Sequence, residues 1–170
     1  PARPAPRMTP AAAVSGDAGS EPPAPFDVLA ALHAAAFAPR PGWSAAGLAA
    51  LGAEAGAFWS GARAAGSHAP RGELLGFALA RVALDEAEIL TFCRTPAAAG
   101  RGVGAALLTP LIEHAAQIGA RSLFLEVDET NHAAHRLYLA FGFSIAGRRS
   151  GYYSTPGGGR ANALTMVRTV

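Results

Sequence analysis

Three side chains that could take part in proton transfer or hydrogen bonding follow one another in the last third of the chain. Glu126 stands in the apolar run LFLEV, where a carboxylate is unusual because glutamate is rarely buried without a partner. It is either an outward-facing position of an alternating strand or a general base. Asn131 begins the next helical segment and can cap it. Tyr138, on that segment, is either a core tyrosine or a proton donor.

A glycine-rich stretch, AAAGRGVGAALL over residues 97–108, precedes an apolar run. A turn of this kind that opens a helix presents main-chain N–H groups to an anion. A Walker phosphate loop needs Lys and Ser/Thr after its last glycine, but Gly104 is followed by Ala105 and Ala106. A dinucleotide fingerprint would need a third glycine where Leu107 stands. The stretch is therefore another kind of anion site or a structural turn.

The elements that would position these groups can be read from the apolar spacing. Helical spacing predicts helices over residues 26–37, 45–53, 103–119 and 131–141, the second capped by Ser44. β-forming runs predict strands over residues 57–65, 73–84, 86–94, 122–127, 143–153 and 162–170. Pro110 interrupts the hydrogen bonding of the third helix, but the apolar face continues on both sides of it. The order ααβββαβαββ is typical of a mixed α/β domain.

Composition excludes several classes of protein. Apolar residues make up 51% and charged residues 15% of the 170 residues, as in one globular domain with a core. A net charge of +2 is too small to indicate a nucleic-acid surface. The single cysteine, Cys93, excludes an internal disulfide, and the histidine spacing suggests no metal site. Apolar runs are broken before the roughly 18 residues of a membrane span.

The first 25 residues differ from the rest. Their Pro, Ala, Ser and Gly content is typical of a disordered leader, and no convincing strand can be placed there. We therefore expect one folded domain over residues 26–170, preceded by a disordered segment over residues 1–25.

The glycine-rich stretch and its context resemble the GCN5-related N-acetyltransferases (GNAT family). Their loop for the pyrophosphate of coenzyme A has the pattern Gln/Arg-x-x-Gly-x-Gly/Ala; residues 99–104 match both glycines, while Ala99 replaces Gln/Arg. DEAEILTF, RGVGAALL, LFLEVDETNHAAHRLYLAFGF, GRRSGYY and ALTM are similar, in this order, to segments of the family's bacterial ribosomal-protein-alanine N-acetyltransferases. This resemblance covers residues 26–166, with Asn162 where an aspartate is usual.

The resemblance implies an α/β (α+β) GNAT fold, in which a mixed central sheet flanked by helices is splayed between two strands. The pantetheine arm of acetyl-CoA would lie along one splayed strand as an added strand does. Cys93 would supply backbone there, its thiol being packed in the core. The residues that the resemblance assigns to acetyl-CoA are Phe92, Cys93, Arg94, Ala99, Gly100, Arg101, Gly102, Val103, Gly104 and Asn131.

The activity implied is transfer of an acetyl group from acetyl-CoA, as co-substrate, to the N-terminal amine of a protein by direct attack on the thioester. Glu126 would be the general base, Tyr138 the acid that protonates the leaving thiolate, and Tyr152 and Tyr153 would line the peptide groove. An α-amine, with a pKa near 8, needs less help from a base than a lysine amine near 10.4. The catalytic steps need no metal.

The implied acceptor is the N-terminal alanine of a small-subunit ribosomal protein, met in the cytoplasm. We expect a monomer or weak dimer with no direct contact to nucleic acid or membrane. Two other functions stay open: an acetyltransferase for lysine or a small amine on the same scaffold, and a module that binds coenzyme A or a protein partner without turnover. Arg148, Arg149 and Arg160 are expected to be surface residues.

Overall fold

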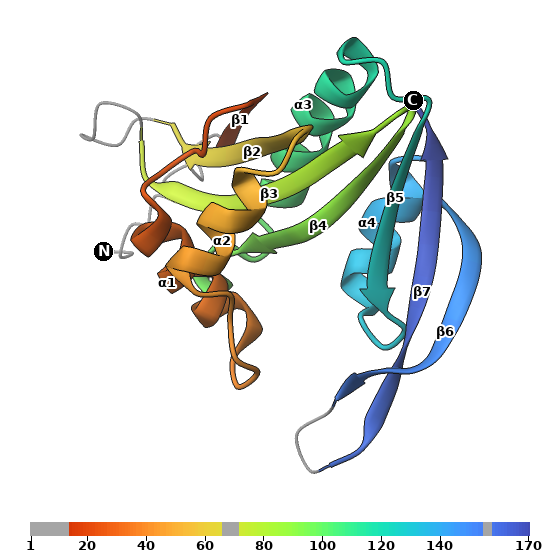
Figure 1. Ribbon diagram of the computed structural model, residues 1–170. Helices are drawn as coiled ribbons and strands as arrows, with labels where there is room; N and C mark the ends of the chain where they lie inside the picture. The colour runs from red at the N-terminus through yellow and green to blue at the C-terminus, as the bar shows by residue number, and fades with distance from the viewer. Residues whose placement is uncertain (1–13, 66–71, 155–157) are drawn as a thin grey trace, which may run out of the picture.

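The computed structural model describes residues 14–65, 72–154 and 158–170, and these residues form a seven-stranded sheet with helices on its faces (Figure 1). The sheet order is β1-β2-β3-β4-β5-β7-β6. The strands are β1 (Val14–Gly19), β2 (Ala57–Ala64), β3 (Leu74–Ala83), β4 (Glu86–Arg94), β5 (Ser122–Asp128), β6 (Ser144–Ser154) and β7 (Arg160–Thr169). The helices are α1 (Phe26–Phe37), α2 (Ala45–Gly52), α3 (Val103–Gln117) and α4 (His132–Ala140), with a 3-10 turn η1 (Pro96–Ala98). The α/β class and the order of elements from α1 onward are confirmed.

The sheet divides into two arms between β4 and β5. These neighbours are parallel, and their register runs only from Glu86 opposite Ser122 to Ile89 opposite Leu125. Beyond these positions the strands diverge, and Figure 1 shows the wedge-shaped opening between them. We call β1 to β4 the N-terminal arm, and β5, β7 and β6 the C-terminal arm. The expected splay between these two strands is confirmed.

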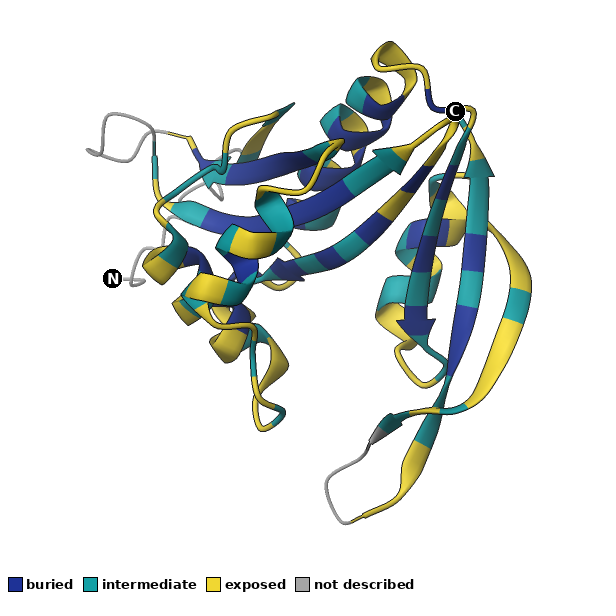
Figure 2. Cartoon of the chain, viewed as in Figure 1, coloured by how far each residue is buried: buried dark blue, intermediate teal, exposed yellow. Residues whose placement is uncertain are grey.

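Helices cover the two arms unequally. In the N-terminal arm, α1 and α2 lie on one face and α3 on the other (Figure 1). In the C-terminal arm, α4 covers the face to which Leu125 and Val127 point. In the part of the chain that the structure describes, no helix covers the other face of this arm. Figure 2 shows the result as alternating buried and less buried positions along β5.

Strand β1 corrects one expectation. Residues 14–25 are not a disordered leader, because Val14 to Gly19 pair with β2 from Ala64 to Trp59. The sequence VSGDAG is poor in β-forming residues, so this strand depends on tertiary contacts. A Cβ at Gly16 would come within 1.7 Å of the carbonyl oxygen of Ala106 in α3, so only glycine permits this approach. Residues 1–13 lie outside the described residues.

Two local predictions about the helices are confirmed. The hydroxyl of Ser44 caps α2 by accepting the N–H of Gly47 at 3.1 Å. Helix α3 continues through Pro110, with its buried face formed by leucines on both sides of the proline. Among the described helices, none is both long enough and apolar enough to cross a bilayer.

Candidate active site

The glycine loop lies between β4 and α3, as expected from the sequence. Gly102 is the N-cap of α3 and has φ of 79°, a left-handed conformation that favours glycine. The first-turn N–H groups from Val103 onward have no acceptor within the helix and are available to an anion. The N–H groups of Ala99 and Arg101 instead donate to the carbonyls of Pro96 and Ala98. These two N–H groups are therefore engaged within the loop and not directed at an anion.

The end of β4 offers an open main-chain edge to the wedge. Residues 91–94 are paired with β3, and the β5 register ends at Ile89, so residues 90–94 have no partner on β5. The Phe92 ring packs edge-on against Tyr138, with 5.9 Å between the ring centroids. Cys93 packs in the core as expected, and burial raises the pKa of its thiol to about 12. The guanidinium of Arg94 turns back to donate to the carbonyls of Thr95 and Pro96.

A β-bulge interrupts β4 where the arms separate. Leu79 lies opposite Thr91 and Ala80 opposite Ile89, so Leu90 is an extra residue on β4. The extra residue of a bulge does not take part in the regular ladder. Main-chain N–H groups at this point are suited to stabilise negative charge that develops on a substrate in the wedge.

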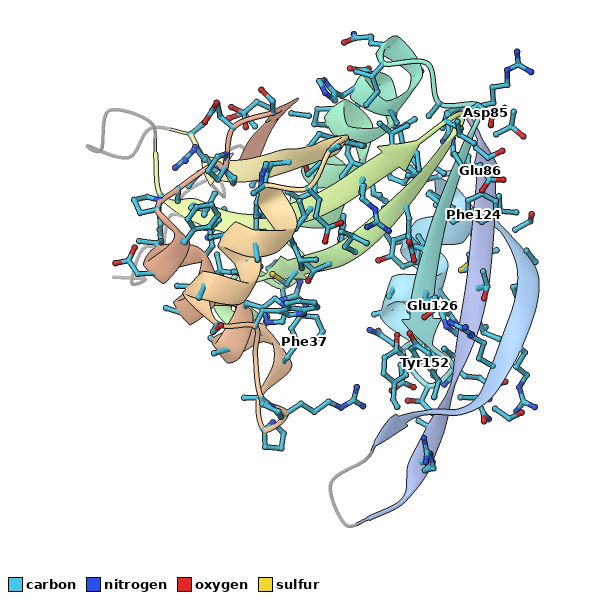
Figure 3. All side chains as sticks on the ribbon, viewed as in Figure 1. Phe37, Asp85, Glu86, Phe124, Glu126 and Tyr152 are labelled. Carbon is cyan, nitrogen blue, oxygen red and sulfur yellow. The ribbon has the colours of Figure 1, made fainter. Side chains whose placement is uncertain are left out.

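Glu126 lies on the face of β5 that no described helix covers, and its side chain is only 19% exposed. Its Oε1 accepts a hydrogen bond from the guanidinium of Arg149 on β6 at 2.5 Å. The neighbouring Glu126 carboxylate raises the pKa of the Tyr152 phenol. The Arg149 guanidinium also lies 5.0 Å from the Tyr152 ring centre. Figure 3 shows Glu126 and Tyr152 together on the C-terminal arm, with Phe37 of α1 across the opening.

Tyr138 and Asn131 both come from α4. Asn131 caps this helix by accepting the N–H of Ala134 at 3.1 Å, which confirms its structural role. Tyr138 is 6% exposed and lies between Phe92 of β4 and Phe143, so its ring stands between the two arms. Burial raises the pKa of Tyr138, so the phenol keeps its proton at neutral pH.

The opening is bridged at its wide end by the segment between α1 and α2, residues 38–44. Arg40 of this segment donates to Oδ2 of Asp128 on β5 at 3.0 Å, and its guanidinium lies 5.5 Å from the Tyr153 ring centre. Burial acts against the charge of Asp128, but hydrogen bonds from Thr130 and Arg40 lower its pKa. Burial also raises the pKa of Tyr153 to about 12. Of the described ion pairs, this is the one that joins the arms at their open end.

A second ion pair supports the strand that carries the two tyrosines. Arg148 donates twice to Glu129, both bonds at 2.8 Å, and this pairing lowers the pKa of Glu129 to about 2. The Asn162 amide donates to the same carboxylate at 2.7 Å and accepts the N–H of Gly151 at 2.9 Å. An aspartate at position 162 could not make the first of these bonds, so asparagine is well matched to Glu129 here.

The structure brings the expected groups to one place and adds others. Tyr138 packs on Phe92 at the β4 edge, and Gly104 at the start of α3 lies against Leu137 of α4. Glu126 and Tyr152 lie on the C-terminal arm beside the wedge, and Tyr153 lies beside Arg40 of the bridging segment. Arg148 and Arg149 are exposed, as expected for surface residues, but both pair with glutamates of the C-terminal arm. The position of Arg149 beside Glu126 depends on the irregular register of β6, for which the sequence carries no local signal. No pattern in the sequence placed Arg40 at the site. His68, one of the histidines considered for a metal site, lies outside the described residues.

Comparison with known proteins gives a family and several relatives. The model of the acetyltransferase (GNAT) family matches residues 29–143. The ribosomal protein bS18-alanine N-acetyltransferase of Haemophilus influenzae is 39% identical over 95 residues, which are 56% of this chain and 64% of that protein. Its counterpart in Escherichia coli is 39% identical over 96 residues, again covering 56% and 64%. These alignments span less than two thirds of each relative's own length.

Solved structures agree with this assignment of the fold. The crystal structure of the ribosomal-protein-S18-alanine N-acetyltransferase from Escherichia coli has a TM-score of 0.77 and 28% identity, over 91% of this chain and 94% of that one. A GCN5-related N-acetyltransferase from Kribbella flavida has a TM-score of 0.69 at 23% identity, over 92% and 98%. At that identity, the second match is evidence for the fold alone.

Proposed function

The chain belongs to the GNAT acetyltransferase family, and we propose that it is an acetyl-CoA-dependent N-acetyltransferase that modifies the N-terminal alanine of a small-subunit ribosomal protein. The observation that carries the proposal is the wedge between β4 and β5, where an open main-chain edge, the start of α3 and the Glu126 carboxylate meet. The named relatives, which act on an alanine of protein bS18, support this acceptor. The protein would encounter a ribosomal acceptor in the cytoplasm.

The groups that border the wedge fit acetyl-CoA. The pyrophosphate would accept from the N–H groups at the start of α3, with Arg101 and Gly102 in the preceding turn. The pantetheine arm would pair with the main chain of Phe92, Cys93 and Arg94, where β4 has no neighbour on its β5 side. Backbone groups provide most of these contacts, so the presence of Ala99 instead of Gln or Arg removes one side-chain contact only.

The proposed catalytic roles are supported by where each group lies. Acetyl-CoA supplies the thioester, and the acceptor's amine attacks its carbonyl directly. Glu126 takes the proton from the amine, so the acceptor must compete for this carboxylate with the Arg149 guanidinium that is bonded to it. Main-chain N–H at the Leu90 bulge faces the developing negative charge. The protonated Tyr138 phenol, beside Phe92, donates a proton to the departing sulfur.

An acetylation assay with matched peptides tests the proposal. Free thiol is followed after mixing the protein and acetyl-CoA with a peptide that begins with alanine, the same peptide with a blocked N-terminus, and a blocked peptide with an internal lysine. We expect thiol release, and acetylated product by mass spectrometry, with the free N-terminus alone. Product only with the lysine peptide would indicate a lysine acetyltransferase, and binding of acetyl-CoA without any product would indicate a non-catalytic module.

A further inference from the structure

The buried imidazole of His33 uses both of its ring nitrogens. The side chain lies in α1 and is 3% exposed. Its Nε2 is 3.0 Å from Oγ1 of Thr91, and its Nδ1 accepts the main-chain N–H of Trp43 at 3.2 Å. A nitrogen that accepts carries no proton, so the ring is the neutral tautomer in which Nε2–H donates to Thr91.

The two partners of His33 belong to different parts of the site. Thr91 follows the extra residue Leu90, so one nitrogen is bonded to β4 where the arms separate. Trp43 lies in the segment of residues 38–44, so the other nitrogen is bonded to the bridge across the wide end of the wedge. One side chain therefore connects the strand edge expected to bind the cofactor with the segment that reaches Asp128 on the C-terminal arm.

Packing around His33 holds the bridging segment closely against α1. A Cβ at Gly42 would lie 2.8 Å from the Cα of Ala34 and 3.1 Å from Nδ1 of His33, so glycine is required for this approach. The Phe37 ring stacks on the imidazole with 4.4 Å between centroids. At its other side the segment is bonded through Arg40 to Asp128. The segment is thus fixed to both arms, and its exposed Trp43 is available for contact with an acceptor.

We propose that His33 is a positioning residue, which holds the bridging segment of residues 38–44 against β4 and thereby sets the acceptor site beside the bulge. This inference rests on the proposed function. The contacts of His33 explain why a histidine is suited to this position. The ring donates to Thr91 and accepts from Trp43 at the same time, which Phe, Leu or Lys cannot do. The ring acts on the acceptor through the segment and not by direct contact with reacting atoms.

Amide hydrogen exchange at Trp43 tests the attachment directly, because this N–H is the one that His33 accepts. In His33→Phe, which keeps an aromatic ring but has no acceptor, we expect the exchange rate of Trp43 to rise about tenfold, as for the loss of one hydrogen bond. His33→Asn, whose Oδ1 can replace Nδ1, should keep the slow exchange. His33→Gln reaches Thr91 but has no acceptor near the position of the ring's Nδ1, so its Trp43 exchange should rise as in His33→Phe. It replaces His33→Phe in the test if that variant does not fold.

Kinetics then test the effect on the acceptor. In His33→Phe we expect the KM for the acceptor peptide to rise about tenfold, with the KM for acetyl-CoA and kcat within about twofold of wild type. The matched control is Ser60→Ala, which removes another buried hydrogen bond, from Ser60 Oγ to the Leu107 carbonyl, far from the segment. This control should lower stability and leave both KM values unchanged.

The possible outcomes are distinct. Unchanged Trp43 exchange in folded His33→Phe and His33→Gln overturns the inference, whatever the activity of the protein. Faster exchange with an unchanged acceptor KM, or an equal rise of KM for both substrates, also overturns it. If wild-type protein transfers no acetyl group, the proposed function fails, and the exchange data still decide whether His33 holds the segment.

Discussion

The two arms of the sheet are built in different ways. In the N-terminal arm, β3 is buried without interruption from Leu75 to Ala80, since helices cover both faces. In the C-terminal arm, β5 alternates, with Leu125 and Val127 buried and Glu126 between them on the other face. A strand covered on both faces has apolar side chains on both, so its main chain is what it can offer to a ligand. A strand with one open face can offer side chains.

From this difference we expect each arm to bind a different substrate. The open edge of β4 and the start of α3 present main-chain groups, which suit the cofactor's amide arm and pyrophosphate. The open face of the C-terminal arm presents Glu126, Tyr152 and Tyr153, which suit proton transfer and acceptor binding. Changes in each arm should therefore affect different kinetic constants.

The largest effect is expected for Glu126→Gln. Loss of the base should lower kcat by roughly 10²–10⁴-fold while the KM for acetyl-CoA stays near wild type. The matched control is Glu54→Gln, since Glu54 is also paired with an arginine, Arg81 on β3 of the other arm. Steady-state kinetics of both variants check this. Equal effects of the two substitutions would contradict a special role of the C-terminal arm.

Tyr138→Phe should have the next largest effect. Without the phenol, water must protonate the departing thiolate, so we expect kcat to fall roughly 10²-fold across the whole pH range. The fold should persist, because the ring still packs between Phe92 and Phe143. Circular dichroism and single-turnover kinetics with both substrates saturating provide the measurement. A wild-type rate of the acetyl-transfer step would assign Tyr138 to the core alone.

A change in the glycine loop should affect the cofactor and not the acceptor. Gly102→Ala puts a side chain at φ of 79°, which strains the cap of α3 and moves its first-turn N–H groups. We expect the KM for acetyl-CoA to rise about tenfold. Gly119→Ala is the control, because Gly119 has φ of 93° just beyond the other end of α3. Gly119→Ala should lower the melting temperature about as much as Gly102→Ala does, but leave the KM for acetyl-CoA unchanged.

Removal of the ion pair that bridges the arms should have a smaller effect, confined to the KM for the acceptor. Arg40→Ala and Asp128→Asn each remove the same ion pair, which is partly exposed on the arginine side. We expect each to raise the acceptor KM about threefold, a size typical of such pairs. The double variant should be no worse than either single variant, since both lose one interaction. Additive losses in peptide titrations would show that the two residues act separately.

The smallest effect is expected in the dependence of stability on pH. Burial lowers the pKa of His33 below its usual value near 6.5. The neutral folded ring therefore stabilises the protein fully above pH 6.5, and this contribution is lost as the pH falls through the lowered pKa. We expect the urea midpoint to fall from pH 7 to pH 5, and to fall less in His33→Phe. Asp128 and Glu129, whose pKa values are lowered, titrate below this window.

Local sequence patterns predicted the arms but not their connections. The apolar spacing of α3 and β5 is visible within a few turns or residues, so their positions and the order around them followed from the sequence. Strand β1 could not be predicted, because VSGDAG has little β propensity and is held by β2 and by the close approach of Gly16 to Ala106. Arg40 and Asp128 are separated by 88 positions, and such a contact leaves no periodic trace in either segment.

Glu126 and Arg149 show the same limit within the site. The unusual carboxylate in an apolar strand was visible in the sequence, and the structure places it on the open face beside the wedge. Its partners depend on how β6 lies beside β7 and β5, with shifts in register near Arg149, which the sequence does not show. The chemistry of the residue could thus be predicted, but not the groups that an acceptor must displace.

The unpaired part of β4 also bears on how the protein avoids aggregation. Exposed strand edges recruit other chains, and natural sheets shorten, bend or charge them. The outer edge strand β1 has six residues, and the opposite edge strand β6 is bent by irregular register and carries paired arginines. Residues 90–94 form a third edge, between the arms, where α4 and the bridge of residues 38–44 restrict access by a foreign strand. The fold can therefore keep a main-chain edge unpaired for a ligand without offering it to another copy of the protein.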